Sequence, residues 1–230
     1  MLIGPQNLTL HVNHVRSRVR NAAMAAGRDP NTVTLVAVTK TKTAETIRLA
    51  ATAGVTDFGE NYVQEALAKM DSLADLPLRW HFIGAIQSNK TRAIAERFDW
   101  VHSLDRLGIA KRLSEQRPFH APPLQVCIQV ALVPEPTKGG VAPIALAELA
   151  TAVAALPRLQ FRGLMCLPPP QPDAAAERAV FAQLREALQE LNAGGLKLDT
   201  LSMGMSADFE SAIAEGATVV RIGTALFGAR

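Results

Sequence analysis

The chain of 230 residues is 48% hydrophobic and 20% charged, with a formal net charge of +3. This composition is typical of a folded protein with a substantial core and excludes an intrinsically disordered chain. Basic residues are scattered and aromatic residues make up only 5%, so the sequence indicates neither a grip on a phosphate backbone nor a base-stacking surface for nucleic acid.

The N-terminal part of the chain predicts a helix over residues 6–26, ended by Gly27 and Pro30. The apolar residues that carry its helical spacing are Leu8, Leu10, Val12, Val15 and Val19. This stretch lacks the apolar region of a secretory signal, and no segment approaches the roughly 18 apolar residues that span a bilayer. We therefore expect a cytoplasmic protein with no membrane partner.

After residue 30, short apolar β-branched runs alternate with longer alanine-rich amphipathic runs. The runs interpreted as strands cover residues 34–39, 55–59, 80–84, 100–104, 124–130, 159–165, 198–203 and 218–223. The helices expected between them cover residues 43–53, 61–70, 88–97, 105–116, 142–155, 173–192 and 207–215, with a last short helix after 224. Strands that alternate with helices indicate right-handed crossovers and a parallel sheet.

Eight such units predict an α/β fold, namely a single (β/α)8 TIM-type barrel domain over residues 1–230 with an extra N-terminal helix. A doubly wound open sheet is the alternative. Such a sheet more often has a GxGxxG turn after its first strand, where this chain reads TKTKTAE.

The two cysteines, Cys127 and Cys166, both lie in apolar stretches. Two cysteines do not make a disulfide framework in a chain of this size. We therefore expect buried reduced thiols, with no disulfide and no metal site.

The first predicted strand ends in LVAVTKTK, which places Lys40 at its carboxyl end and Lys42 two residues later. Active sites of (β/α)8 barrels lie at this end of the strands. An amine that is removed from water, or set beside another cation such as Lys42, loses basicity and can attack a carbonyl. The alternative is a lysine that ends a strand and points into water, and we interpret Lys42 itself as solvated.

The last two predicted strands are followed by LSMGMSADFESAI and VVRIGTALFG. Loops after the seventh and eighth strands form the phosphate site of many such barrels. Ser206 offers a hydroxyl and is expected to cap the following helix, while Gly223 and Thr224 offer backbone N–H groups. The alternative is two ordinary turns. A reactive lysine facing a phosphate cup suggests a ligand with an aldehyde and a phosphate, a description that pyridoxal 5′-phosphate (PLP) fits.

Ordered motifs along nearly the whole chain carry a specific resemblance. They are NLTLHVNHVRSRVRNAAMAAGRDP, LVAVTKTK, FGENYVQEAL, WHFIGAIQSNK, HSLDR, GLMCLP and LSMGMSADFESAIAEGATVVRIGTALFG. The sequence closely resembles the pyridoxal-phosphate homeostasis proteins, which are small PLP-binding barrels of PLP fold type III, similar to the N-terminal domain of alanine racemase.

The resemblance implies that Lys40 holds PLP as a Schiff base and that Arg221 faces the pyridine nitrogen. The other cofactor-binding residues that it implies are Asn61 and Met203 beside the ring, and Ser206, Gly223 and Thr224 at the phosphate. Accessory positions are Lys42, His81, Lys90 and Lys138, and Gln87 and Asn89 also match family motifs. His81 lies within a predicted strand, where a core histidine with satisfied hydrogen bonds is the alternative interpretation.

One segment departs from the family pattern. The family usually has an Asn and a Ser before the lysine and glycine that follow the fifth strand, whereas this chain reads IQVALVPEPTKGG. Only Lys138 and Gly139 match there, so the sequence weakens the case for a second PLP contact from this loop.

The resemblance also bears on activity. Arg221 beside the pyridine nitrogen would oppose its protonation, and an unprotonated ring is a weaker electron sink. Alanine racemase uses a tyrosine of another domain as its second base, and the only tyrosine here is Tyr62. The pattern favours a carrier or buffer of PLP in vitamin B6 homeostasis that affects amino-acid balance, without a defined reaction.

The expected carrier is a monomer, with PLP-dependent apoenzymes as candidate recipients. A weak PLP-dependent amino-acid racemase that uses Lys40 as a base is one alternative. A Schiff-base aldolase acting on a phosphorylated substrate, with the same lysine and phosphate cup but no cofactor, is another.

Overall fold

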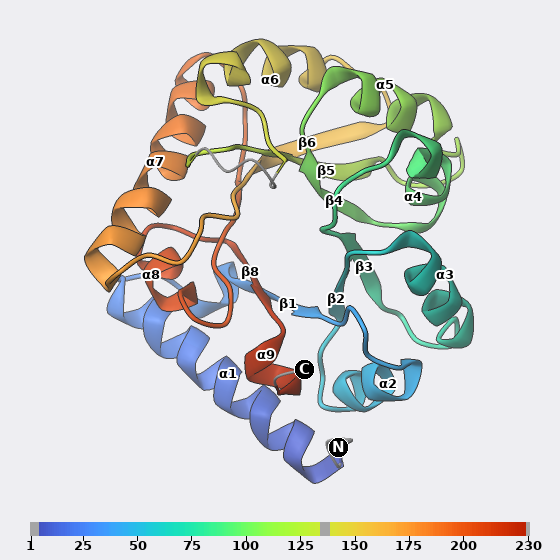
Figure 1. Cartoon of the computed structure of the whole chain (residues 1–230), viewed down its shortest axis with the longest axis vertical. Coiled ribbons are helices and arrows are strands. Elements are labelled where there is room, and N and C mark those ends of the chain that lie inside the picture. Colours follow the sequence, from blue (N-terminus) through green and yellow to red (C-terminus); the bar gives the residue numbers. More distant parts are fainter. Residues whose placement is uncertain (1–4, 134–138, 229–230) are drawn as a thin grey trace.

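The computed structural model describes residues 5–133 and 139–228, and within them eight parallel strands close into one barrel in chain order (Figure 1). The strands are β1 Thr34–Val38, β2 Asp57–Glu60, β3 Arg79–Phe82, β4 Trp100–Leu104, β5 Leu124–Gln129, β6 Leu159–Met165, β7 Thr200–Ser202 and β8 Val219–Ile222. Because β8 pairs with β1, no sheet edge remains open. The predicted TIM-type barrel is confirmed, and the open sheet is wrong.

Helices form a ring outside the strands in Figure 1. They are α1 Pro5–Ala25, α2 Ala44–Thr52, α3 Val63–Ser72, α4 Thr91–Arg97, α5 Leu107–Gln116, α6 Leu146–Ala154, α7 Ala174–Ala193, α8 Phe209–Ala214 and α9 Thr224–Phe227. Short 3-10 turns lie at η1 Pro30–Thr32, η2 Ser88–Lys90 and η3 Pro143–Ala145. The turns η2 and η3 occupy the starts of two segments that the sequence predicted as continuous helix.

Strand β7 is shorter than the predicted strand over residues 198–203, because Leu198 is bonded elsewhere. Its backbone N–H donates to the side-chain oxygen of Asn192 at 2.7 Å, and its carbonyl accepts from the Asn192 amide at 2.9 Å. Asn192 belongs to α7, so a helix side chain occupies backbone groups that a longer strand would need for its ladder.

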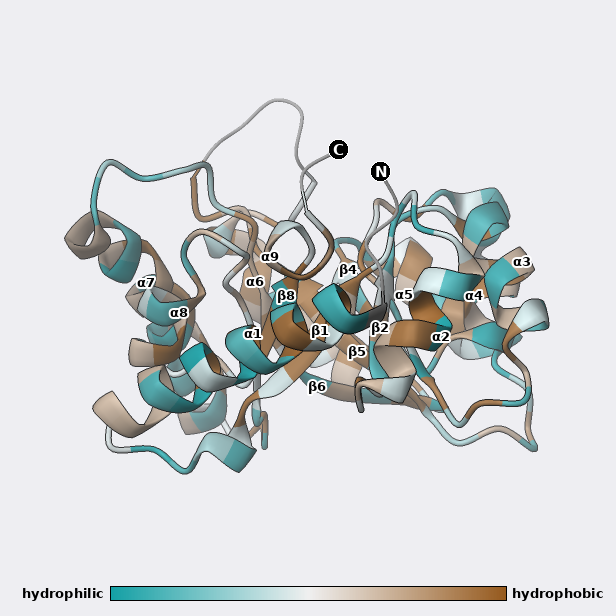
Figure 2. Ribbon diagram, turned by 90° about the horizontal axis from the view of Figure 1, so that it is seen from below, coloured by the Kyte–Doolittle hydropathy of each residue, from teal (hydrophilic) through white to brown (hydrophobic). Residues whose placement is uncertain are grey.

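Helix α1 packs on the outside of the barrel through one apolar stripe. Its buried residues are Leu8, Val12, Val15, Val19 and Ala23. Leu10, which the sequence placed in the stripe, is 64% exposed because it lies off this face. Both views place α1 beside α8 (Figures 1 and 2), where the guanidinium of Arg18 pairs with Glu210. The helix ends at Ala25, one residue before the predicted end at 26, and Gly27 follows with a φ of 67° that suits glycine.

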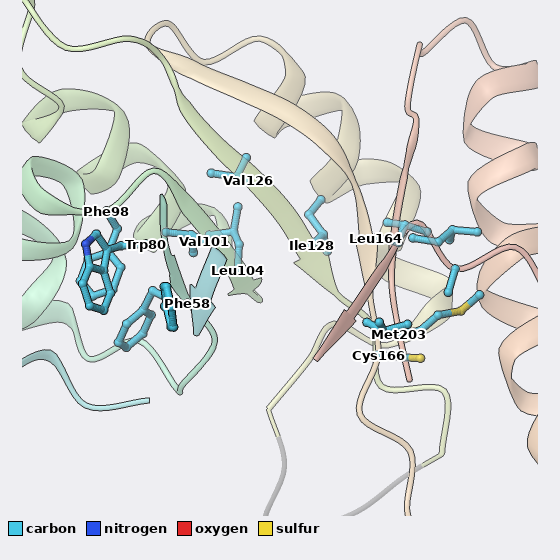
Figure 3. Close-up of a cluster of buried hydrophobic side chains, with 14 of the residues drawn as sticks. Phe58, Trp80, Phe98, Val101, Leu104, Val126, Ile128, Leu164, Cys166 and Met203 are labelled. Atoms are coloured by element: carbon cyan, nitrogen blue, oxygen red, sulfur yellow. The ribbon is translucent and has the colours of Figure 1, made fainter. Parts of the chain in front are cut away.

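Apolar side chains fill the space between strands and helices, and Figure 2 shows the hydrophobic colour concentrated on the central strands. Figure 3 shows one cluster that runs from Phe58 and Phe98 on one side of the barrel to Met203 on the other. Each fully buried large side chain of this kind stabilises the fold by about 1.5–3 kcal/mol. Cys127 and Cys166 are free thiols within this core, as predicted, and burial raises the pKa of each to about 12.

Across residues 5–133 and 139–228, no helix combines the length and the apolar character needed to cross a membrane.

Candidate functional site

Lys40 lies in the turn that follows β1, at the carboxyl end of the barrel strands. Its side chain is half-buried, and among the described residues its ammonium has neither a hydrogen-bond acceptor nor an ion-pair partner. A partly buried amine without a partner loses solvation and gains no contact in return. Lys40 therefore offers an unpaired amine at this end of the barrel.

The turn that carries Lys40 is fixed on both sides. On one side, the buried hydroxyl of Thr39 donates to Oε1 of Glu60 at 2.6 Å. On the other, the backbone N–H of Thr41 donates to Oε1 of Glu65 at 2.6 Å. Thr41 has a φ of 65°, which a β-branched residue rarely adopts, so these bonds hold Lys40 in a turn with a strained backbone.

A buried ammonium from α3 joins these contacts. Nζ of Lys69 donates to the Thr39 carbonyl at 2.7 Å, to Glu60 Oε1 at 2.7 Å and to Glu65 Oε1 at 2.6 Å. Burial raises the pKa of Glu60, and the hydrogen bonds from Lys69 and Thr39 oppose that rise. We call Thr39, Glu60, Glu65 and Lys69 the lysine brace.

The sequence analysis missed the lysine brace. One signal could have found part of it, because Glu65 and Lys69 are four residues apart on a predicted helix, a spacing that favours ion pairs. The contact with Glu60 has no such local signal.

Asn61 follows β2 at the same end of the barrel. Its Oδ1 is buried and has no hydrogen-bond partner among the described residues. The backbone of Gly84 approaches it so closely that a Cβ there would lie 2.1 Å from the Asn61 carbonyl oxygen, which explains why WHFIG ends in glycine. A hollow of about 210 Å³ brings Asn61 together with Tyr62, Gln87 and Lys90.

At the start of α8, Ser206 differs from its predicted role. The helix begins at Phe209 with Asp208 as its N-cap, so the prediction that Ser206 caps it is wrong. The Asp208 carboxylate instead accepts the backbone N–H of Met205 at 2.6 Å and closes the turn. Oγ of Ser206 accepts the N–H of Ala225 at 3.2 Å, which ties the turn after β7 to the start of α9.

Gly223 and Thr224 follow β8 directly. Among the hydrogen bonds of the described residues, neither of their backbone N–H groups has an acceptor. A Cβ on Gly223 would meet the Cβ and carbonyl of Val38 at 3.4 Å, an ordinary contact, so packing alone does not require glycine here. With the nearby Ser206 hydroxyl, the two N–H groups form a set of donors suited to an anion.

Arg221 is 3% exposed and lies in the barrel interior. Nη1 donates to Oγ of Ser202 at 2.6 Å and Nη2 to the carbonyl of Cys166 at 2.8 Å. Burial lowers the pKa of the guanidinium, yet no described carboxylate contacts it. A guanidinium stays charged in proteins and carries five N–H donors, so Arg221 retains donors for a further acceptor.

The other predicted positions are dispersed. Met203 is fully buried within the apolar cluster of Figure 3. Lys42, interpreted as solvated, is instead half-buried, because Nζ reaches the Phe227 carbonyl at the end of α9, 3.4 Å away. His81 is a buried histidine whose two ring nitrogens are both hydrogen-bonded. Lys138 lies outside the described residues, and Gly139 is the first residue after that gap.

The chemical groups at this end of the barrel are of the types that suit a carbonyl carbon, an anionic group and a ring acceptor. The unpaired amine, the N–H groups and the buried guanidinium could bind these three parts respectively. In the described parts of the chain, His, Cys, Asp and Glu side chains form no group of three or more that could hold a metal ion.

The chain was compared with known proteins. Residues 10–230 match the family model of the N-terminal domain of alanine racemase. A protein of Pseudomonas aeruginosa named pyridoxal phosphate homeostasis protein is 63% identical over 220 residues, which cover 96% of this chain and 94% of that protein.

Two solved structures of PipY from Synechococcus elongatus have the same fold. The structure without PLP has a TM-score of 0.87 and 42% identity, and it covers 96% of this chain and 100% of its own. The structure with PLP bound has a TM-score of 0.84 and 40% identity, with the same coverage.

Proposed function

The chain belongs to the pyridoxal phosphate homeostasis proteins, within the alanine racemase N-terminal domain family, and on this premise we propose that it binds PLP and acts in PLP homeostasis. Its role is that of a carrier or buffer of vitamin B6 that affects amino-acid balance. The observation that carries the proposal is the unpartnered, half-buried Lys40 ammonium at the strand ends of a chain 40% identical to a barrel with PLP bound.

In this proposal Lys40 holds the cofactor covalently. Its unprotonated amine bonds to the aldehyde carbon as a Schiff base, and one water molecule is released. The lysine brace fixes the turn that carries Lys40, so the backbone from which the amine projects is set before the ligand arrives.

The Ser206 hydroxyl and the N–H groups of Gly223 and Thr224 would hold the phosphate. The guanidinium of Arg221 would donate to the pyridine nitrogen, and Asn61 and Met203 would border the ring. Because a guanidinium only donates, the nitrogen in contact with it stays unprotonated. PLP supplies an electron sink that is weakened under these conditions, which favours storage and transfer over catalysis.

We further propose that the protein works as a cytoplasmic monomer and passes PLP to PLP-dependent apoenzymes. Lys40 is half-buried and Thr224 is exposed, so both ends of the proposed site are open to solvent and to an acceptor protein.

Borohydride reduction tests the proposal. The protein is incubated with PLP, reduced, digested and mapped by mass spectrometry, and we expect one phosphopyridoxyl group on Lys40. Lys40→Ala should lose the adduct, while Lys111→Ala, which removes an exposed lysine of α5, should keep it. Absence of any adduct on Lys40 in the wild-type protein contradicts the proposal. Trapping of a phosphorylated ketose instead of PLP would support the aldolase alternative.

A further inference from the structure

Five polar side chains from five strands form a continuous line of hydrogen bonds through the barrel interior. Asp57 Oδ1 lies 3.0 Å from Nε2 of His81, and Nδ1 of His81 lies 2.9 Å from Nε2 of His102. Nδ1 of His102 lies 2.7 Å from Oγ of Ser202, which accepts from Arg221 at 2.6 Å. We call these five residues the core relay, and all of them are buried.

The fixed donor Arg221 and the fixed acceptor Asp57 allow one assignment of donors for every hydrogen bond in the core relay with both histidines neutral. Arg221 can only donate, so Oγ of Ser202 accepts from it, and the Ser202 O–H is free to donate to Nδ1 of His102. His102 then carries its proton on Nε2 and donates to Nδ1 of His81. His81 in turn donates from Nε2 to the carboxylate of Asp57. One proton arrangement therefore satisfies all four bonds, with each histidine carrying a single ring proton.

The opposite assignment of hydrogen-bond donors and acceptors in the core relay is unfavourable. If Nδ1 of His102 donated to Ser202, the Ser202 hydroxyl would have no acceptor among the described residues. His81 would also need a second proton to keep its bond to Asp57. Burial lowers the pKa of His102 well below the usual histidine range; any positive charge on His81 and the charge of Arg221 act in the same direction, and Asp57 acts against them. The net lowering keeps Nδ1 of His102 able to accept from Ser202.

The core relay runs from the start of β2 to the last two strands, and its terminal residues Asp57 and Arg221 both pair with Val36 of β1. Arg221 and Ser202 lie near the carboxyl ends of β8 and β7, and Asp57 is the first residue of β2. Burial would raise the pKa of Asp57, but hydrogen bonds from His81 and Arg79 outweigh it and hold that pKa well below its usual range. The carboxylate is thus a fixed acceptor that anchors the direction of the whole line.

We propose that Asp57, His81, His102 and Ser202 are positioning residues that hold the Arg221 guanidinium in the orientation in which it meets the cofactor ring. The inference rests on the proposed function, because it assigns a role toward PLP. Arg221 has no carboxylate in contact, so its orientation depends on two neutral acceptors, the Cys166 carbonyl and the Ser202 hydroxyl. The core relay keeps the second acceptor correctly turned.

Histidine nitrogen NMR on the protein without PLP tests the hydrogen-bond directions independently of cofactor binding. The chain has 5 histidines, and ¹⁵N labelling separates the ring tautomers. We expect His81 and His102 to carry their proton on Nε2 at neutral pH, and Asp57→Asn to alter both signals. A proton on Nδ1 of His102 would overturn the inference.

A double-mutant cycle tests whether Ser202 positions Arg221 toward the cofactor. Ser202→Ala removes the acceptor for Arg221, and we expect PLP affinity to fall about tenfold, as for loss of one hydrogen bond to a charged group. The absorption spectrum of bound PLP should change with it, and Ser202→Thr, which keeps the hydroxyl, should restore both. When Arg221→Met is already present, adding Ser202→Ala should lower PLP affinity no further. Ser114→Ala, which removes a buried hydroxyl of α5, is the matched control.

The outcomes separate this inference from the proposed function. If the wild-type protein gives no PLP adduct on Lys40, the proposed function fails. If the adduct forms but Ser202→Ala binds PLP with unchanged affinity and spectrum, only the positioning role is overturned. The positioning role would also be overturned if Ser202→Ala lowered PLP affinity equally in the wild-type protein and in Arg221→Met, because the serine would then act independently of Arg221.

Discussion

The lysine brace and the core relay each bury a cation, but they treat its charge differently. Lys69 contacts two carboxylates, Glu60 and Glu65, so its charge is matched inside the protein. Arg221 contacts a hydroxyl and a carbonyl, and the described residues place no carboxylate against it. The charge of Lys69 therefore serves the fold around Lys40, whereas that of Arg221 stays available to a ligand.

The largest expected effect comes from breaking the lysine brace. Lys69→Met leaves the Glu60 carboxylate buried without its cation, and we expect the free energy of unfolding to fall by about 3–5 kcal/mol. Chemical denaturation measures the change. The double variant Glu60→Gln with Lys69→Met should regain part of the loss, and no recovery would mean that charge matching is not what Lys69 supplies.

The same variant has a predictable pH dependence. With its pKa raised above the unfolded value, Glu60 favours the folded state when it is protonated, and that contribution is lost as pH rises. The difference in free energy of unfolding between the wild-type protein and Lys69→Met should therefore shrink in acid. A difference that grew in acid would contradict a raised pKa of Glu60.

An intermediate effect is expected from the neutral histidine of the core relay. Because the folded pKa of His102 is lowered, the unfolded chain binds its proton first as pH falls below about 6.5. His102 should thus make stability fall with a slope approaching about 1.4 kcal/mol per pH unit between pH 6 and 5. Denaturation at several pH values should show a shallower slope for His102→Phe, while the exposed-histidine control His14→Ala keeps it.

The smallest effect on stability is expected from Arg221→Met. The change removes a buried charge that no described carboxylate contacts, although Asp208 attracts it from a distance, and it loses two hydrogen bonds, so the net loss should be about 1 kcal/mol. PLP binding should fall much more than stability does. A loss as large as that of Lys69→Met would mean that the charge of Arg221 also serves the fold, and the distinction between the two buried cations would be wrong.

Much of the fold could be predicted from the sequence, because the relevant signals are local. β-branched runs alternating with amphipathic runs have periods that each segment carries by itself, so the barrel and the position of Lys40 after the first strand follow from them. The predicted ends of strands and helices were less accurate where a residue distant in sequence bonds the backbone, as the Asn192 side chain does at Leu198. The helix cap predicted at Ser206 failed because Asp208 occupies that position.

The composition and periodicity of the sequence determined a closed α/β barrel with a lysine at its strand ends and small polar residues in its last two turns. The tertiary structure alone decided which polar groups are partnered. His102 and Ser202 are 100 positions apart, and Lys69 meets Glu60 only when α3 packs on β2. Hydrogen bonds of about 3 Å depend on the closure of the barrel, and no local spacing encodes that closure.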